Sequence, residues 1–429
     1  MAVVLKTDVK EFNPVYNPMN VVIYQNNAVT RAKPDYRYIF DINIIDYISG
    51  TTIVIRTKVN PDPVQGFGIQ DLHSIIENYV KETIPPNDDT SAIRVTDNAI
   101  IKFYVEYGEE YRLTADDPIV EYENELTGDN KYAWGASFEH HRFIDFFNND
   151  LYEDYLCLAT DTGEFLTNQK TNKVYANQLG WHWYMTSLPN QVDYLQVKTY
   201  DASGVLISTF DIPNNASVVL NQSRINSVAT APQSLNNITG AFLAGAQPVI
   251  IPTVASYTVQ LFKTGAVPLS EILYFEIDTE CFYETYRIHF ENEYGAFDSF
   301  NFKADSKVQY NGERKSYITN QNVLTSNGIS YQHVTENKIN YYIRNSEVIT
   351  LQSGLIDKAT NDWLKELSFS PRVYLEFLDG TIVQEETGFR NFKPCIIRSA
   401  KWNEKVDEID KAFNFSIDIE LADNFRQRR

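Results

Sequence analysis

Sulfur-containing residues are scarce in the chain, which has three cysteines and three methionines among 429 residues. Cys157, Cys281 and Cys395 lie far apart and share no spacing that is typical of a zinc site or a disulfide framework, so we expect three reduced thiols in the core. The sequence also lacks a run of about eighteen apolar residues and an apolar segment near its start. We therefore expect neither a membrane span nor an export signal, and assembly in a cytoplasm.

Positive charge is also in short supply, because 37 Lys and Arg residues face 57 Asp and Glu residues, for a formal net charge of −20. Non-specific affinity for nucleic acid comes from a surface that neutralises phosphates, and this composition argues against one. We expect no stable binding to DNA. An acidic wall could still face DNA in transit, since like charge keeps the polymer from sticking.

The familiar catalytic frames are missing too. The sequence has no GxSxG elbow, no phosphate-binding glycine loop, no HExxH and no recognisable Cys/His pair, so we expect no enzyme and no cofactor. A glycosidase stays open as an alternative, because its two carboxylates need no fixed spacing.

Two groups of potential metal ligands are present. The acidic stretch 116–130 lacks the EF-hand frame and is read as a solvated loop. Glu139, His140 and His141 are adjacent, but neighbouring histidines point to different sides of a strand or helix, so we expect no metal site there.

Aromatic residues are abundant, with 28 Tyr and 25 Phe, and they favour strands. We expect a mainly β chain of several β-sandwich units. The first unit, 1–188, carries one principal helix at about 69–83. The second, 189–266, resembles an immunoglobulin-like or fibronectin-like sandwich with a long, exposed, Asn/Ser-rich loop at 213–249. The third, 267–429, carries one principal helix at about 353–367.

Trp181 and Trp183 stand two residues apart in an aromatic group. In a strand they share one face, which could form a stacking platform for a sugar ring or a wall of the core. The core interpretation is favoured, and a carbohydrate-binding module is kept as the alternative.

The most regular stretch of the chain is Tyr286–Phe302. Apolar and polar residues alternate on both sides of a tight turn at Asn292–Gly295, which predicts a hairpin. Gly295 lets the backbone take a positive φ, so that the strands return immediately. Nothing in this stretch is placed for chemistry.

The same stretch carries a resemblance. Its pattern Phe290-x-Asn292-x-x-Gly295-x-x-Asp298-x-Phe300-x-Phe302 is similar to a strand–turn–strand signature of virion proteins from tailed phages that infect Bacteroidota, including crAss-like phages. Segments 34–42 and 363–374 are similar to parts of the same proteins. The resemblance leaves collar ring, tail tube and baseplate open.

The resemblance implies a structural subunit of the virion, assembled in the bacterial host cytoplasm. Such subunits form closed rings of about six or twelve copies in the tail or head-to-tail assembly, around the DNA path and beside other virion proteins. Two segments are candidate contacts between copies: the loop 213–249, and the N-terminal arm 1–20, whose apolar start lacks an obvious local partner.

Overall fold

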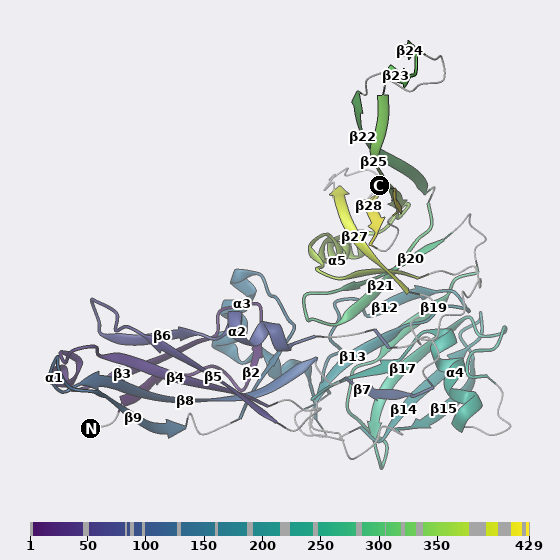
Figure 1. Ribbon diagram of the computed structural model, residues 1–429. Helices are drawn as coiled ribbons and strands as arrows, with labels where there is room; N and C mark the ends of the chain where they lie inside the picture. Colours follow the sequence, from purple (N-terminus) through teal and green to yellow (C-terminus); the bar gives the residue numbers. More distant parts are fainter. Residues whose placement is uncertain are drawn as a thin grey trace. The chain divides into compact units, whose positions relative to one another are not determined.

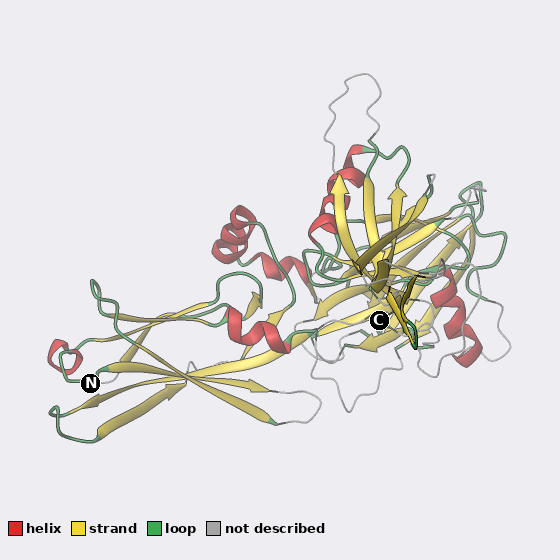
Figure 2. Ribbon diagram, turned by 45° about the horizontal axis from the view of Figure 1, so that its top comes forward, coloured by secondary structure: helices red, strands yellow, loops and turns green. Residues whose placement is uncertain are grey.

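The computed structural model describes residues 3–45, 51–81, 84–85, 90–96, 99–126, 130–158, 162–186, 192–214, 224–242, 248–279, 285–304, 306–318, 322–331, 338–376, 392–401, 413–422 and 426–428. Strands account for 52% and helices for 14%, which confirms the mainly β, multi-sheet class (Figures 1 and 2). The chain divides into two compact units. Unit 1 holds Met1–Thr279 and Glu291–Asp298, and unit 2 holds Glu280–Phe290 and Ser299–Arg429.

The first part of unit 1 is built from two sheets. One has the order β1 (Val3–Thr7), β3 (Asn20–Gln25), β6 (Phe67–Asp71). The other has the order β2 (Phe12–Pro14), β10 (Lys131–Trp134), β8 (Ile100–Arg112), β4 (Arg37–Ile45), β5 (Thr52–Val59), with β9 (Ile119–Leu126) paired to β8. Residues of both sheets, among them Val21, Ile23, Phe40 and Phe103, share one buried cluster. Burial of this apolar surface stabilises the pair of sheets.

Two further sheets complete unit 1. One has the order β11 (Leu156–Cys157), β13 (Trp181–Thr186), β16 (Ile225–Ala229), β7 (Ile93–Val95). The other has the order β12 (Thr171–Val174), β19 (Leu273–Ile277), β17 (Ser256–Lys263), β14 (Tyr194–Tyr200), β15 (Leu206–Pro213), with β18 (Val267–Pro268) paired to β17. The first of these sheets crosses the boundary expected at 188, since β13 pairs with β16. The second crosses the boundaries expected at 188 and 266, since β12 pairs with β19.

The helix expected at about 69–83 is confirmed only over its centre, as α2 (His73–Ile76) and η1 (Glu77–Tyr79). Its first residues are strand, since Ile69 and Gln70 belong to β6, where their backbone pairs with β3. The apolar residues at helical spacing lie in or directly beside the two helical segments, and these are Leu72, Ile75, Ile76, Tyr79 and Val80. Residues 82–83 lie outside the described residues. Asp71 does lie at the start of α2, where its carboxylate accepts from the His73 amide.

Three other helical segments of unit 1 are longer than α1 (Ala28–Arg31). They are α3 (His140–Asn149), η2 (Leu151–Tyr155) and α4 (Pro232–Phe242). The expected loop 213–249 is corrected by β16 and α4, which lie within it, and all five residues of β16 are buried. Residues 215–223 and 243–247 of that segment lie outside the described residues. Pairing with β13 and β7 buries Asn226 and Ser227, the two polar residues of β16.

Two further segments expected to be irregular are strands. The N-terminal arm pairs through β1 with β3 and through β2 with β10, and Val3 is buried, so the arm has local partners. The acidic stretch 116–130, read as a loop, contains β9, which pairs with β8 from Arg112 to Glu106. Its Ile-Val-Glu-Tyr-Glu-Asn-Glu-Leu sequence shows that a strongly acidic strand is stable when its neighbour provides the ladder.

Unit 2 has one large sheet, whose first two strands form the expected hairpin. The order is β21 (Phe297–Phe302), β20 (Tyr286–Glu291), β26 (Val373–Glu376), β27 (Phe392–Lys401), β28 (Ser416–Leu421), β25 (Lys338–Gln352), β22 (Lys307–Ile318), with β29 (Arg426–Arg428) paired to β25. The short hairpin β23 (Asn322–Thr325) and β24 (Gly328–Tyr331) follows β22. The tip of the first hairpin, Glu291–Asp298, belongs to unit 1.

The helix expected at about 353–367 is confirmed as α5 (Lys358–Phe369), with its start five residues later. Asp357 caps it, since its carboxylate accepts from the Thr360 amide at 2.7 Å. Trp363, Leu364 and Leu367 are buried in the core of unit 2 together with Phe290. The apolar period of 3.6 residues therefore predicted the buried positions in the second half of the helix, whereas Leu355, counted in the same period, precedes α5 and is 82% exposed.

Candidate functional site

The tip of the signature hairpin, Glu291–Asp298, is held by its own asparagine. The Asn292 side-chain oxygen accepts from the amides of Tyr294 at 3.0 Å and Ala296 at 3.1 Å. Its side-chain nitrogen donates to the Leu166 carbonyl at 2.8 Å. Asn292 is buried, so its amide group depends on these protein partners for its hydrogen bonds. This residue therefore shapes the turn and fastens it to a distant loop.

Gly295 has two reasons to be glycine. Its φ is +71°, which confirms the positive φ expected for the turn. A Cβ on Gly295 would also lie 2.4 Å from the carbonyl carbon and 2.5 Å from the carbonyl oxygen of Gly135. Next to this contact, the Ser137 amide donates to the Glu293 carbonyl at 2.7 Å. The backbone of the tip thus lies directly against the backbone that follows β10.

Arg142 of α3 also binds the tip. Its guanidinium donates to the Glu293 carboxylate and to the Tyr294 hydroxyl, and reaches the Tyr155 hydroxyl at 3.3 Å. Burial alone would lower the pKa of Arg142, but Tyr294 and Glu293 outweigh it and raise that pKa. Burial raises the pKa of Tyr294 well above its ordinary value. Arg142 therefore stays charged and the Tyr294 hydroxyl stays protonated near neutral pH, so this pair holds the tip without exchanging a proton.

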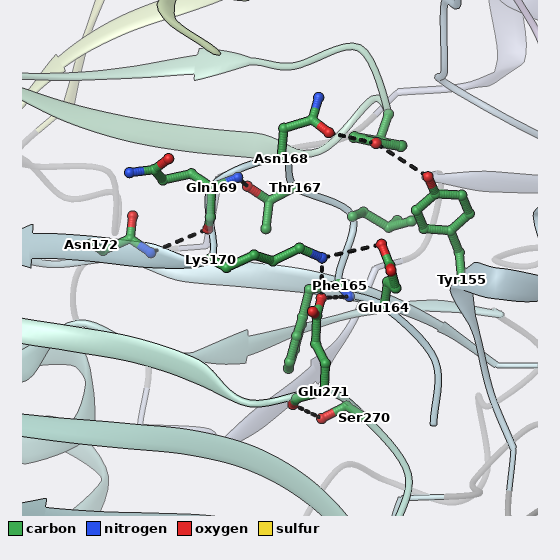
Figure 3. Close-up of polar contacts among 12 residues, drawn as sticks. Tyr155, Glu164, Phe165, Thr167, Asn168, Gln169, Lys170, Asn172, Ser270 and Glu271 are labelled. Carbon is green, nitrogen blue, oxygen red and sulfur yellow. Dashed lines mark hydrogen bonds and ion pairs between the residues drawn. The ribbon is translucent and has the colours of Figure 1, made fainter. Parts of the chain in front are cut away.

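The loop at 162–170 completes the surroundings of the tip (Figure 3). Asn168 donates to the Glu293 carboxylate at 2.5 Å and accepts from the Tyr294 hydroxyl at 2.9 Å. Lys170 lies between the carboxylates of Glu164 and Glu271, and Glu271 also accepts from the Phe165 amide at 2.9 Å. Figure 3 shows Asn168 and Tyr155 approaching the same point from two sides. These contacts fix the loop that receives Asn292.

The tip site is therefore a set of interlocked polar groups from four segments that are distant in sequence. The signature residues Asn292 and Gly295 take part directly, and Asp298 is buried at the end of the tip. Arg142, Tyr155 and Asn168 were not foreseen, because nothing in their local sequence indicates a partner more than a hundred residues away. The arrangement has no nucleophile beside a base, and what it does is hold a turn in place.

Trp181 and Trp183 lie in β13, with side chains 6% and 2% exposed. Trp183 packs against Phe297 of the tip, with ring centroids 5.8 Å apart. A sugar ring stacks on an exposed indole face, and neither residue offers one in this structure. Their burial agrees with the favoured interpretation of a core wall.

The candidate ligands and thiols form no metal or redox site in the part of the chain that the structure describes. His140 and His141 are exposed at the start of α3, and His141 lies 3.6 Å from the Glu139 carboxylate. Cys157 and Cys395 are buried free thiols, whereas Cys281 lies outside the described residues. Burial raises the pKa of the Cys157 thiol, so it is not a thiolate near neutral pH.

Unit 2 contains a buried ionic group of its own. His289 of β20 lies 2.7 Å from the Glu376 carboxylate of β26, and Arg287 lies 3.3 Å from the same oxygen. Arg287 also donates to Ser299 at 2.5 Å and to Asn301 at 3.2 Å, across the hairpin. Burial lowers the pKa of His289 despite the hydrogen bond to Glu376, which opposes this shift. The group links three strands of the sheet through buried polar contacts.

The most exposed element of unit 2 is a two-stranded arm formed by β22 and the part of β25 that pairs with it, Lys338–Thr350. Figure 1 shows β22 and β25 running side by side, with β23 and β24 at the far end. Apart from Ser316, every residue of β22 is exposed, including Tyr310 at 73% and Ile318 at 83%. Strand β22 was not predicted, because it mixes charged, polar and aromatic residues on both faces.

Comparison with known proteins provides no family. No family model and no curated protein sequence matches the chain. Among solved structures it is weakly similar to the native conformation of E. coli alpha-2-macroglobulin, with 8% identity and a TM-score of 0.19, over 84% of this chain and 22% of that one. For a mutant of Salmonella alpha-2-macroglobulin the values are 6% and 0.15, over 100% of this chain and 34% of that one. The chain thus spans about a fifth to a third of these proteins, and the similarity is too low to carry an argument.

No helix in the described ranges is both long enough and apolar enough to cross a membrane.

Proposed function

We propose that the chain is a non-enzymatic structural subunit of a tailed-phage virion, which forms part of a ring in the tail or head-to-tail assembly. In this proposal the protein acts in the particle, after assembly in the bacterial cytoplasm. Its partners are further copies of itself, about six or twelve in a closed ring, and neighbouring virion proteins.

The observation that carries the proposal is the exposed arm. Twelve residues of β22 pair with β25 alone, and β25 itself is flanked by β28 only over Val348–Gln352 and by β29 only over Ile343–Asn345. At 338–342, where neither β28 nor β29 flanks β25, β22 and β25 form a two-stranded ribbon, and a ribbon of this kind is marginally stable in water. Such an element is expected where another chain covers it, as in an assembly of repeated subunits.

The signature hairpin supports the same proposal. The residues that carry the resemblance, Asn292 and Gly295, are occupied by hydrogen bonds and backbone contacts that fix the shape of the tip. A subunit that must present constant surfaces to its neighbours needs such rigidity, whereas an enzyme needs reactive groups in a cleft. The buried, protonated or fully paired side chains around the tip suit the first requirement.

The charge of the chain suits a part that surrounds a DNA path. A net charge of −20 gives no general attraction for phosphates, so DNA would pass without stable binding. The carbohydrate-binding alternative rested on Trp181 and Trp183, and their burial leaves it without an observation in its favour.

The experiment is a quantitative mass-spectrometric analysis of purified particles of the phage that encodes the sequence. We expect several copies of the chain per particle, in a fixed ratio to the major capsid protein. A non-structural protein from the same infection serves as the control for contamination. If the chain is absent from particles, or as rare as that control, the proposal fails.

A further inference from the structure

No described strand pairs with the outer edge of β22. In the described part of the chain its one sheet neighbour is β25. The backbone N–H and C=O groups on its other side therefore form a template for a further strand. Its side chains add apolar surface to this template, with Tyr310 and Ile318 strongly exposed. Native proteins usually blunt such an edge, so an edge of twelve residues left open indicates a partner strand.

The charge of β22 restricts what that strand can be. It carries Lys307, Arg314 and Lys315 against Glu313, a formal charge of +2 in a chain of charge −20. Like charges opposite one another in a sheet are destabilising, so the β22 strands of two copies would not pair well. An acidic edge on the neighbouring copy would pair well.

Such an edge exists in unit 1. β9 carries Glu121, Glu123 and Glu125 in eight residues and has no basic residue. Glu121 lies 3.0 Å from Arg56 and 3.8 Å from Lys58 of its own sheet, so the remaining formal negative charge of the strand is that of Glu123 and Glu125. Within the described sheets β8 is its one neighbour, which leaves its other edge open. The edge strand β5 carries Arg56 and Lys58, and the edge strand β15 carries Asp211 alone. Among the described edge strands, β9 is therefore the most acidic.

We propose that β22 of one copy adds to the open edge of β9 in the next copy. The contact rests on the proposed function, since it supplies the joint of the ring. The donor strand belongs to unit 2 and the acceptor strand to unit 1, so each copy offers two different surfaces. Repetition of such a head-to-tail contact generates a closed ring when the rotation between copies closes. Cross-strand pairs of opposite charge set the partner and the orientation.

The test uses charge reversal on the full-length chain. R314E/K315E makes the donor edge acidic, and E123K/E125K makes the acceptor edge basic. We expect native mass spectrometry and light scattering to find oligomers for the wild type and monomers for each variant alone. An equal mixture of the two variants should assemble again, because the acidic β22 of one matches the basic β9 of the other. The control K81E/K263E reverses two exposed lysines away from both edges and should assemble like the wild type. Circular dichroism should show the same strand content in all four proteins.

Several results would overturn the contact: a monomeric wild type, either edge variant that assembles normally, or a mixture that stays monomeric. A DNA-binding arm would also contradict it, and would appear as a gel shift of a labelled duplex that R314E/K315E abolishes while oligomers persist. These failures differ from failure of the proposed function. If the chain is abundant in particles but the mixture does not assemble, the virion role stands and the joint lies elsewhere.

Discussion

Gly295→Ala is the sharpest probe of how the tip is held. Alanine must adopt a φ of +71°, a left-handed conformation that costs about 1–2 kcal/mol for a residue with a Cβ. The new methyl group would also overlap the backbone of Gly135, with the nearest atoms at 2.4, 2.5 and 2.7 Å. Forcing one extra carbon into a packed region costs about 1–3 kcal/mol, and here the opposing atoms are backbone that cannot rotate away. We expect a total loss of roughly 2–5 kcal/mol in the free energy of unfolding of unit 1.

Two matched variants separate the causes. Gly204→Ala places alanine at a φ of +76° with no atom within 4 Å, so it should cost the conformational part alone, about 1–2 kcal/mol. Gly135→Ala sits on the other side of the same contact, but its nearest neighbour would be the Gly295 Cα at 3.5 Å, an ordinary distance. We expect this change to be nearly neutral.

The assay is urea unfolding followed by tryptophan fluorescence, since Trp134, Trp181 and Trp183 all belong to unit 1. With a slope of about 3 kcal/mol per M, the Gly295→Ala midpoint should fall by roughly 0.7–1.7 M. The reasoning is refuted if Gly295→Ala shifts the midpoint no more than Gly204→Ala does. It is equally refuted if Gly135→Ala is as damaging as Gly295→Ala.

Two further predictions concern buried polar groups. Asn292→Ala leaves the Tyr294 and Ala296 amides and the Leu166 carbonyl without this partner, and should lower the free energy of unfolding of unit 1 by about 3 kcal/mol or more. The control Asn78→Ala removes an exposed asparagine and should have little effect in the same urea assay. Equal effects of the two changes would contradict this role of Asn292. Burial lowers the pKa of His289 in the folded state, so below the ordinary pKa of 6.5 the unfolded state binds a proton that the folded state resists. The free energy of unfolding of unit 2 should therefore fall as the pH drops below about 6.5, by up to about 1.4 kcal/mol per pH unit. His289→Gln should flatten this dependence, measured as the pH-corrected hydrogen exchange of β20 and β26 amides, and an unchanged slope would count against the assignment.

The elements predicted correctly are those whose signals lie within a short stretch of sequence. The hairpin at Tyr286–Phe302 and the helix α5 follow from alternation, a glycine turn and an apolar period of 3.6, all within a few residues. The same rules failed at Ile69 and Gln70, where pairing with β3 decided the conformation. They also failed at β16, a strand whose Asn226 and Ser227 look like loop residues but lie buried between two neighbours.

The tip site was predictable only in its turn residues. Asn292 and Gly295 could be identified because a turn needs them, but the second requirement on Gly295 comes from Gly135, which is 160 positions earlier in the sequence. The pair of Arg142 with Glu293 spans 151 residues. Contacts of this kind depend on how sheets are ordered in space, and a single sequence contains no local pattern for them.

The discontinuous make-up of unit 1 has a consequence for the order in which the chain folds. Its first segment ends at Thr279, but the tip that neutralises Arg142 and covers the backbone of Gly135 arrives only with Glu291–Asp298. At about 5–20 residues per second, a ribosome needs roughly 1–4 s to add the 19 residues between positions 279 and 298. During that interval the Arg142 guanidinium and the Gly135 backbone of the nascent unit lack the segment that covers them in the folded protein. A protein truncated at Thr279 would remain permanently at that stage, and would resemble an arrested intermediate more than an isolated domain.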